Sequence, residues 1–340
     1  MPTPPAICPL RGRGVVATSA LASPASDASV ETLVDWLEFE AFFSVYGVAR
    51  IDEVSGAIKI QEEEANDNIG AADALHEQFR LDVENEFARR TQQLGAAYPF
   101  ELSNDGEELV FRRSPEGAPS FYLLCLVLSH VTRSPILLVL PKDAAVRDVR
   151  QRHFQILSTL AVAGVCEGPS LSLGWPRPSG DSILEVVARG CELSQTGSAK
   201  AAPGSTASPA AKDGGIDVLA WSDHYGRPPP NTFWFGQAAS GHGWPTKSSM
   251  DVYKDFIDDY YLEQPRCNSA FVTVCPFIIS DGDLARHSLK HGTLLDRLRA
   301  PANALRGVQL ARGGTYVEEF DNARKLAVWL GRYRQAVRAA

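Results

Sequence analysis

The feature that most constrains the fold is a change from helical to extended patterning in the second half of the chain. "IDVLAW" (216–221) and "NTFWFGQAA" (231–239) are rich in branched and aromatic residues, and the turn-forming stretch "SDHYGRPPP" separates them. These runs predict a β-hairpin. The continuous apolar run "NSAFVTVCPFII" (268–279) predicts a buried central strand. Helical patterns occupy 179–193 and 248–265, so the predicted order is helix, strand, strand, helix, strand.

Asp217 lies inside the first predicted strand, between Ile216 and Val218. A buried carboxylate is strongly unfavourable unless it is paired or coordinates a metal ion. We therefore interpret Asp217 as a metal ligand, with a capped turn or a salt bridge to Lys or Arg as the alternative. Alternate side chains of a strand share a face, so an antiparallel hairpin would bring Gln237 within one coordination shell of Asp217.

The segments "GGIDVLAW" and "FWFGQAASGHGWPTK" resemble, in this order of elements, the restriction-endonuclease-like fold of the PD-(D/E)xK nucleases. With "LLDRLR" further on, they look like nuclease-like proteins of bacterial antiphage and restriction loci. The resemblance covers about residues 149 to 300. It implies an α/β (α+β) core with a mixed central sheet flanked by helices. It also implies an endonuclease that uses Mg²⁺ or Mn²⁺ to hydrolyse DNA phosphodiester bonds in antiviral defence.

The resemblance assigns roles to residues of the hairpin. Asp217 takes the place of the metal-binding aspartate, and Gln237 takes the place of the following acid, where its carbonyl oxygen can still bind a hard cation. Ala239 stands where the lysine is usual. Lys247 is the first candidate to supply that positive charge and His242 is the second. The alternatives are a satisfied buried amide for Gln237 and an exposed helix start for Lys247.

Upstream residues complete the predicted site. Glu185 or Glu192 is expected to supply the helical acid of such sites, and Phe154-Gln155 stands where related nucleases often have Phe-Glu. Both glutamates are therefore candidate metal ligands. Trp221 and Trp244 are predicted to be core residues, not platforms for nucleobases.

The chain is predicted to have two domains. Residues 1–28 are rich in Pro, Ala and Ser and are expected to be disordered, with a cleaved leader as the less favoured alternative. Residues 29–148 predict a mainly helical domain, and 149–340 the restriction-endonuclease-like domain. Within the latter, 193–213 lacks periodicity and predicts a flexible loop.

Charge and composition limit the remaining functions. The formal net charge is -8, but residues 286–340 carry eleven Lys and Arg against four acids, which predicts either a phosphate-facing surface or a basic solvated helix face. The six cysteines form no CxxC pair and are expected to be reduced buried thiols. We find no P-loop, no GxGxxG after a strand, no HExxH and no nucleophile elbow, so the sequence gives no basis for an ATPase, a dehydrogenase or a serine hydrolase.

The hypothesis from sequence is therefore a cytoplasmic, metal-dependent DNA endonuclease without membrane spans. Its helical domain would serve recognition, regulation or binding of protein partners, and the sequence leaves an oligomer open. The alternative is a degenerate nuclease fold that binds nucleic acid or acts as a scaffold, which Gln237 and Ala239 favour. A third hypothesis places the function in the helical domain.

Overall fold

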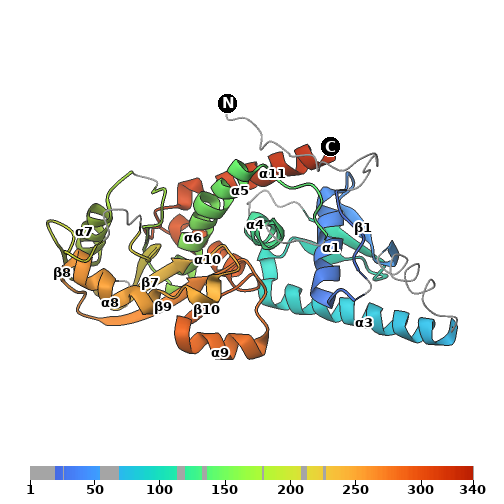
Figure 1. Cartoon of the computed structure of the whole chain (residues 1–340), viewed down its shortest axis with the longest axis horizontal. Coiled ribbons are helices and arrows are strands. Elements are labelled where there is room, and N and C mark those ends of the chain that lie inside the picture. Colours follow the sequence, from blue (N-terminus) through green and yellow to red (C-terminus); the bar gives the residue numbers. More distant parts are fainter. Residues whose placement is uncertain are drawn as a thin grey trace. The chain divides into compact units, whose positions relative to one another are not determined.

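The chain divides into two compact units in the computed structural model (Figure 1). One unit comprises the described residues up to Val146 together with those from Ala327 on, and the other is Arg147–Leu326. The C-terminal residues thus belong to the first unit, although the sequence placed all of 149–340 in the second. The structure describes residues 20–25, 27–53, 69–112, 119–131, 136–177, 180–207, 213–224 and 227–339. The predicted disordered segment 1–28 lies largely outside these residues.

The first unit combines helices with a small antiparallel sheet. Its helices are α1 (Val30–Phe43), α3 (Ile69–Leu94), α4 (Pro119–His130) and most of α11 (Arg324–Arg338), with a 3₁₀ turn at Gly95–Ala97. Its strands, in the order β1-β3-β2, are Val48–Arg50, Glu108–Phe111 and Phe100–Leu102. The prediction of a mainly helical domain missed this sheet, because strands of three or four residues are too short to show an alternating pattern.

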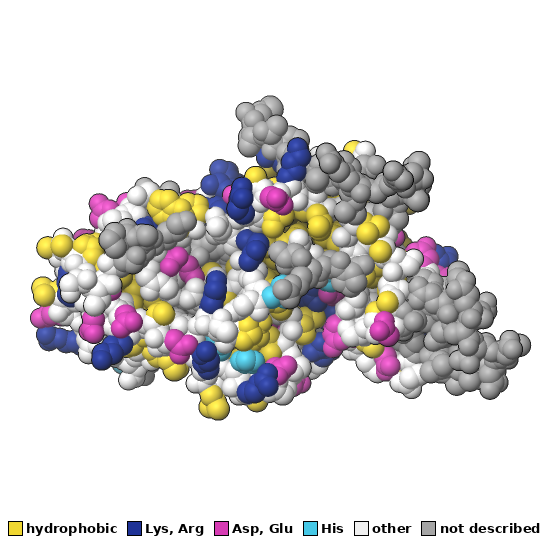
Figure 2. Space-filling model, in the orientation of Figure 1, with side chains coloured by type: hydrophobic (Ala, Val, Ile, Leu, Met, Phe, Trp, Pro, Cys, Tyr) yellow, Lys and Arg dark blue, Asp and Glu magenta, His cyan; other side chains and the backbone are white. Residues whose placement is uncertain are grey.

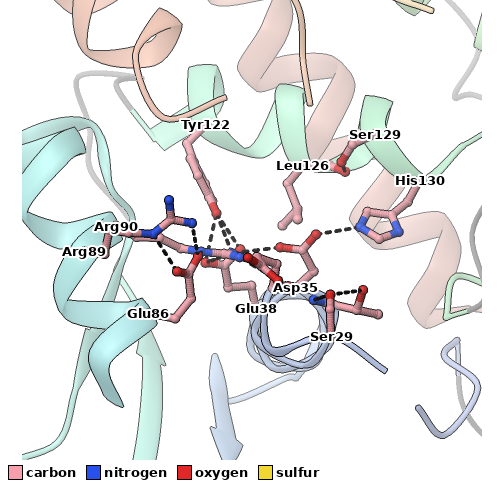
Figure 3. A network of polar contacts seen from close by, with 12 residues as sticks. Ser29, Asp35, Glu38, Glu86, Arg89, Arg90, Tyr122, Leu126, Ser129 and His130 are labelled. Atoms are coloured by element: carbon pink, nitrogen blue, oxygen red, sulfur yellow. Dashed lines mark hydrogen bonds and ion pairs between the residues drawn. The ribbon is translucent and has the colours of Figure 1, made fainter. Parts of the chain in front are cut away.

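A buried ionic network joins α1, α3 and α4 in this unit (Figure 3). Arg90 on α3 is fully buried, and its Nη1 donates to Asp35 Oδ1 at 2.7 Å and to Glu38 Oε1 at 2.9 Å. Its Nε donates to Glu86 Oε1 at 2.7 Å, and Tyr122 Oη donates to Glu38 Oε2 at 2.7 Å. One guanidinium therefore balances the negative charge of carboxylates from α1 and α3, so the packing of these two helices depends on the network.

The second unit is built on a mixed five-stranded sheet in the order β10-β9-β7-β6-β4 (Figure 1). The strands in this order are Thr293–Leu295, Asn268–Val274, Arg227–Ala238, Val218–His224 and Ser170–Ser172. A two-stranded ribbon pairs β5 (Ser198–Ala199) with β8 (Tyr261–Glu263). The helices are α6 (Phe154–Cys166), α7 (Ile183–Ser194), α8 (Ser249–Tyr260), α9 (Asp281–His291) and α10 (Ala300–Arg312), with 3₁₀ turns at Trp244–Thr246 and Phe320–Asn322.

The predicted hairpin and the order of elements around it are confirmed. Strands β6 and β7 pair antiparallel, with Val218 opposite Gly236, and β9 then adds to β7 in parallel. The predicted helices on either side are α7 and α8, and Ser182 caps α7. The fold class is therefore α/β with a mixed sheet.

Neighbouring residues of β7 show how helices cover both faces of this sheet. Phe235 packs against Phe256 of α8, while Gly236 faces Val162 of α6, so the two helices lie on opposite faces. On the α6 side, α10 packs behind α6. The two helices approach so closely that a Cβ at Gly164 or at Gly307 would collide with backbone atoms of the other helix.

The segment 193–213, predicted to be a flexible loop, includes a helix end and a short strand in its described part. Its first residues end α7, residues 198 and 199 form β5, and Thr206 Oγ1 donates to Asp259 Oδ1 of α8 at 2.5 Å. Residues 208–212 lie outside the described part of the chain. Polar contacts to α8 and pairing with β8 therefore replace the hydrophobic periodicity that the segment lacks.

At least four of the eleven basic residues after position 285 are paired with acids. Arg286, Lys290, Arg299 and Arg306 pair with Asp283, Asp251, Asp296 and Glu167, respectively. On the face shown in Figure 2, the described Lys and Arg side chains are interspersed with acids. Among the described residues, no helix has the length and apolar character needed to cross a bilayer. The described cysteines are free thiols, four of them buried, and Cys8 lies outside the described residues.

Candidate functional site

A pocket of about 320 Å³ opens at the end of β7 in the second unit. It is lined by side chains from the helix that begins at α5 (Asp143–Asp148), from the loop after β4, from the hairpin and from the turn before α8. The lining residues are Arg147, Arg150, Gln151, Gln155, Trp175, Asp213, Asp217, Gln237, Ala238, Ser240 and Lys247. The structure thus brings three of the predicted site residues, Asp217, Gln237 and Lys247, to one place.

The backbone of Asp217 is fixed from three sides. Its N–H donates to Gly236 O of β7 at 2.8 Å, which continues the hairpin ladder by one residue. Its carbonyl oxygen accepts from Leu173 N at 2.7 Å and Gly174 N at 2.9 Å, and also from Gln155 Nε2 at 2.6 Å. The carboxylate is therefore held in position by β7, the loop after β4 and helix α6 together.

The carboxylate itself is buried but not isolated. Asp217 Oδ2 accepts from Gln237 Nε2 at 2.6 Å and from Ala238 N at 2.8 Å. Burial, and after it the negative charge of Asp213, raise the pKa of Asp217 to about 7, although the Ala238 N–H, Lys247 and Gln237 act in the opposite direction. The group therefore changes charge near neutral pH, where a small change in its surroundings alters its protonation.

Three cations line the same pocket as this carboxylate, and Lys247 lowers the pKa of Asp217. Arg147 and Arg150 lie one turn apart on the helix leading into α6, and Lys247 follows the 3₁₀ turn after β7. None of the three pairs with an acid among the described residues. The Nε of Arg150 is buried and has no hydrogen-bond partner among those residues. Against two acids, Asp213 and Asp217, this gives the pocket an excess of positive charge that favours an anionic ligand.

Asp217 Oδ1 and Gln155 Oε1 both lie close to the backbone of Gly174. A Cβ at this glycine would come within 2.7 Å of Asp217 Oδ1 and closer still to Gln155 Oε1. The bond from Gln155 Nε2 to Asp217 O fixes which end of the amide faces the glycine. Carboxylate and amide oxygens are ligand types that Mg²⁺ and Mn²⁺ accept, with water and phosphate oxygens in the remaining positions. No group of three or more His, Cys, Asp or Glu gathers among the described residues, so a closed protein cage is not formed there.

Other predicted site residues lie elsewhere. Glu185 is the third residue of α7, and its Oε2 accepts from Ser182 N at 2.7 Å in a capping box, which lowers its pKa. Glu192 is exposed on the same helix, and neither glutamate lines the pocket. His242 is exposed in the turn after β7, with its ring 4.4 Å from that of Phe277. Ala239 is buried in an apolar cluster and is not a lining residue.

The sequence contained a signal for the residues that were missed. Positions 147, 150, 151 and 155 are spaced by three, one and four, so Arg147, Arg150, Gln151 and Gln155 share one helical face. A π-helical turn at Val149–His153 joins α5 to α6, and such turns are frequent at functional sites. This face carries two cations and two amides and leads into the apolar helix α6. Such a polar face indicates the wall of a polar pocket.

Comparison of the chain with protein-family models, with curated proteins and with solved structures gave no match. The functional argument therefore rests on the pocket and on the residues that form it.

The pKa of Asp217 predicts an unusual pH dependence of stability. Because the folded-state pKa is raised from 3.8 to about 7, the free energy of unfolding falls as pH rises from about 4 to 7 and stays lowered above that. Asp217→Asn removes this cost. We expect the variant to match the wild type near pH 4 and to exceed it by about 4 kcal/mol at pH 8.

Urea unfolding in EDTA at several pH values measures this difference. Asp255→Asn, which changes an exposed carboxylate of α8, is the matched control and should show no such trend. A constant difference between Asp217→Asn and the wild type at all pH values would contradict the raised pKa.

Proposed function

We propose that the pocket binds a phosphodiester of DNA and that the protein is a metal-dependent endonuclease with a restriction-endonuclease-like core. The observation that carries the proposal is that Arg147, Arg150 and Lys247, none of which pairs with an acid among the described residues, line one pocket with a buried carboxylate. Phosphate oxygens are the usual partners of such a cluster, and Arg binds them in a bidentate manner. The setting in bacterial antiphage defence is proposed from the resemblance alone, with a role of the first unit in recognition or partner binding.

The residues of the pocket divide into metal-binding, positioning and charge-stabilising roles. Asp217 and Gln155 would hold Mg²⁺ through the oxygens that face Gly174, and Gln237 orients the Asp217 carboxylate through its 2.6 Å hydrogen bond. Such an ion lowers the pKa of a bound water and neutralises charge on the phosphate. Ala239 stands where a lysine is usual, and Lys247 takes over the role of that lysine. It stabilises the negative charge that develops on the phosphate. Arg147 and Arg150 bind its other oxygens.

A second candidate function is binding of nucleic acid without hydrolysis. It is favoured by the amides at Gln155 and Gln237, which leave Asp217 and Asp213 as the acids of the pocket. An Asp217 carboxyl with a pKa of about 7 is protonated in an appreciable fraction of molecules at neutral pH and then binds a cation weakly.

A cleavage assay that compares the wild type with Lys247→Ala distinguishes the two candidate functions. Supercoiled, linear and single-stranded DNA, and RNA, are incubated with Mg²⁺ or Mn²⁺. We expect metal-dependent cleavage by the wild type and a rate lower by about 10²–10³ for Lys247→Ala, since one electrostatic contact to the reacting group is lost. Lys254→Ala, which changes an exposed lysine of α8, should cleave at the wild-type rate.

Binding by the wild type without cleavage under any metal condition would reject the endonuclease and leave the second candidate. Cleavage that Lys247→Ala leaves unchanged would remove this residue from the mechanism. Failure of the wild type to bind any of the nucleic acids would reject both candidates.

A further inference from the structure

Trp175 is an exposed aromatic residue at the wall of the pocket. It is 46% exposed, whereas Trp221 of β6 and Trp244 of the turn after β7 are 2% and 9% exposed. Trp175 directly follows Gly174, against which the oxygens of Asp217 and Gln155 converge. A large apolar ring thus lies beside the proposed phosphate site and remains accessible to a ligand.

The loop holds this ring in place without burying it. Before Trp175, Leu173 and Gly174 both donate to the carbonyl oxygen of Asp217. After it, Arg177 Nη1 donates back to Leu173 O at 2.8 Å, and its Nε donates to Asp181 O at 2.5 Å. The Arg177 guanidinium also lies over the Trp175 ring, with its Cζ 5.4 Å from the centroid. Trp175 therefore does not depend on core packing for its position.

Keeping a tryptophan exposed and fixed is useful when a flat ligand stacks on it. Nucleobases are such ligands, because every base has a π-face, and stacking on aromatic side chains is the usual way in which proteins bind unpaired strands. In a continuous duplex both faces of each base are covered by its neighbours. A ring at the wall of a phosphate pocket can therefore reach a base only where the strand is unpaired or ends.

We infer that Trp175 stacks on a base next to the phosphodiester in the pocket, and that the site therefore takes single-stranded or frayed nucleic acid in preference to continuous duplex. The inference rests on the proposed function, since it needs a nucleic-acid strand in the pocket. It assigns to Trp175 a role in substrate choice, while Lys247 and the arginines act on the phosphate and Asp217 would hold the metal ion.

Fluorescence anisotropy with end-labelled 12-nucleotide probes tests this assignment. The probes are a single strand of mixed sequence, the same strand with abasic residues throughout, and a blunt duplex, each measured in EDTA and with Ca²⁺. We expect the wild type to bind the base-bearing single strand more tightly than the other two. Trp175→Ala should bind that strand roughly tenfold or more weakly and the abasic strand as the wild type does. Trp175→Phe should retain most of the affinity.

Tyr316→Ala is the matched control, because Tyr316 is also 46% exposed in the same unit and does not line the pocket. An equal loss for Trp175→Ala on the base-bearing and abasic strands would overturn stacking and leave the phosphate site intact. If the wild type bound the duplex more tightly than the single strand, and Trp175→Ala lost this binding, the ring would contact a groove of the duplex and the stacking inference would be wrong. No binding of any probe by the wild type would reject the proposed function and this inference together.

Discussion

Replacing Asp217 with asparagine is expected to lower the rate of DNA cleavage at least a thousandfold. Asparagine keeps the size of the side chain and an oxygen that accepts from Gln237 Nε2 and Ala238 N. It removes the negative charge that faces Gly174 beside Gln155 Oε1. A catalytic metal ion contributes several kcal/mol to the transition state of phosphate transfer, and loss of its carboxylate ligand forfeits most of this.

The same variant is predicted to be more stable than the wild type at pH 8, so unfolding cannot explain its loss of activity. Cleavage of end-labelled DNA in single turnover, at several concentrations of Mg²⁺ and Mn²⁺, measures the effect. Asp255→Asn on α8 serves again as the control. Retention of metal-dependent cleavage in Asp217→Asn would remove Asp217 from the site, and the metal-binding role of Gln155 with it.

Replacing Arg90 with methionine is expected to destabilise the first unit by about 3–5 kcal/mol. Methionine occupies a similar volume and is unbranched, so the loss is of charge and hydrogen bonds more than of packing. Asp35, Glu38 and Glu86 would then lie buried without the guanidinium that now bonds to all three. Removal of one partner from a buried ion pair is costly because the remaining charges keep their desolvation penalty.

Thermal unfolding of the full chain, with hydrogen exchange of α1 and α3, measures this loss in the first unit. Arg50→Met provides the contrast, since Arg50 pairs with Asp52 at 3.0 Å in an exposed position. Its expected cost is small, because solvent screens an exposed ion pair. Equal effects of the two substitutions would show that the buried network contributes no more than a surface pair does.

Much of the second unit could be predicted from the sequence because its elements are long enough to show a period. Branched and aromatic residues in β6 and β7 and the turn chemistry between them predicted the hairpin, and the helical pattern over 179–193 predicted α7. The three- and four-residue strands of the first unit carry no comparable signal. The network around Arg90 is equally hidden, because Asp35 and Arg90 are 55 residues apart.

The site was predictable only where the hairpin register determines it. Pairing of β6 with β7 places Asp217 next to Gln237, and the lysine after the strand is near in sequence. Arg150 and Trp175 reach the pocket from other elements. The helical spacing from Arg147 to Gln155 indicates a polar face, but only tertiary packing brings that face and Trp175 to the hairpin. The prediction for Glu185 rested on its position in a helix, but a glutamate three residues after a serine N-cap has a competing use in closing the helix end.

The close contact between α6 and α10 makes the pocket sensitive to substitutions at that contact. Gly164 and Gly307 allow the two helix backbones to touch, and α6 carries Gln155 near its other end. A methyl group at either glycine would push α6 away from α10 and so shift the amide that holds the Asp217 carbonyl. Gly164 and Gly307 do not line the pocket, yet substitution of either glycine is expected to move Gln155 and thereby to change the chemistry of the pocket.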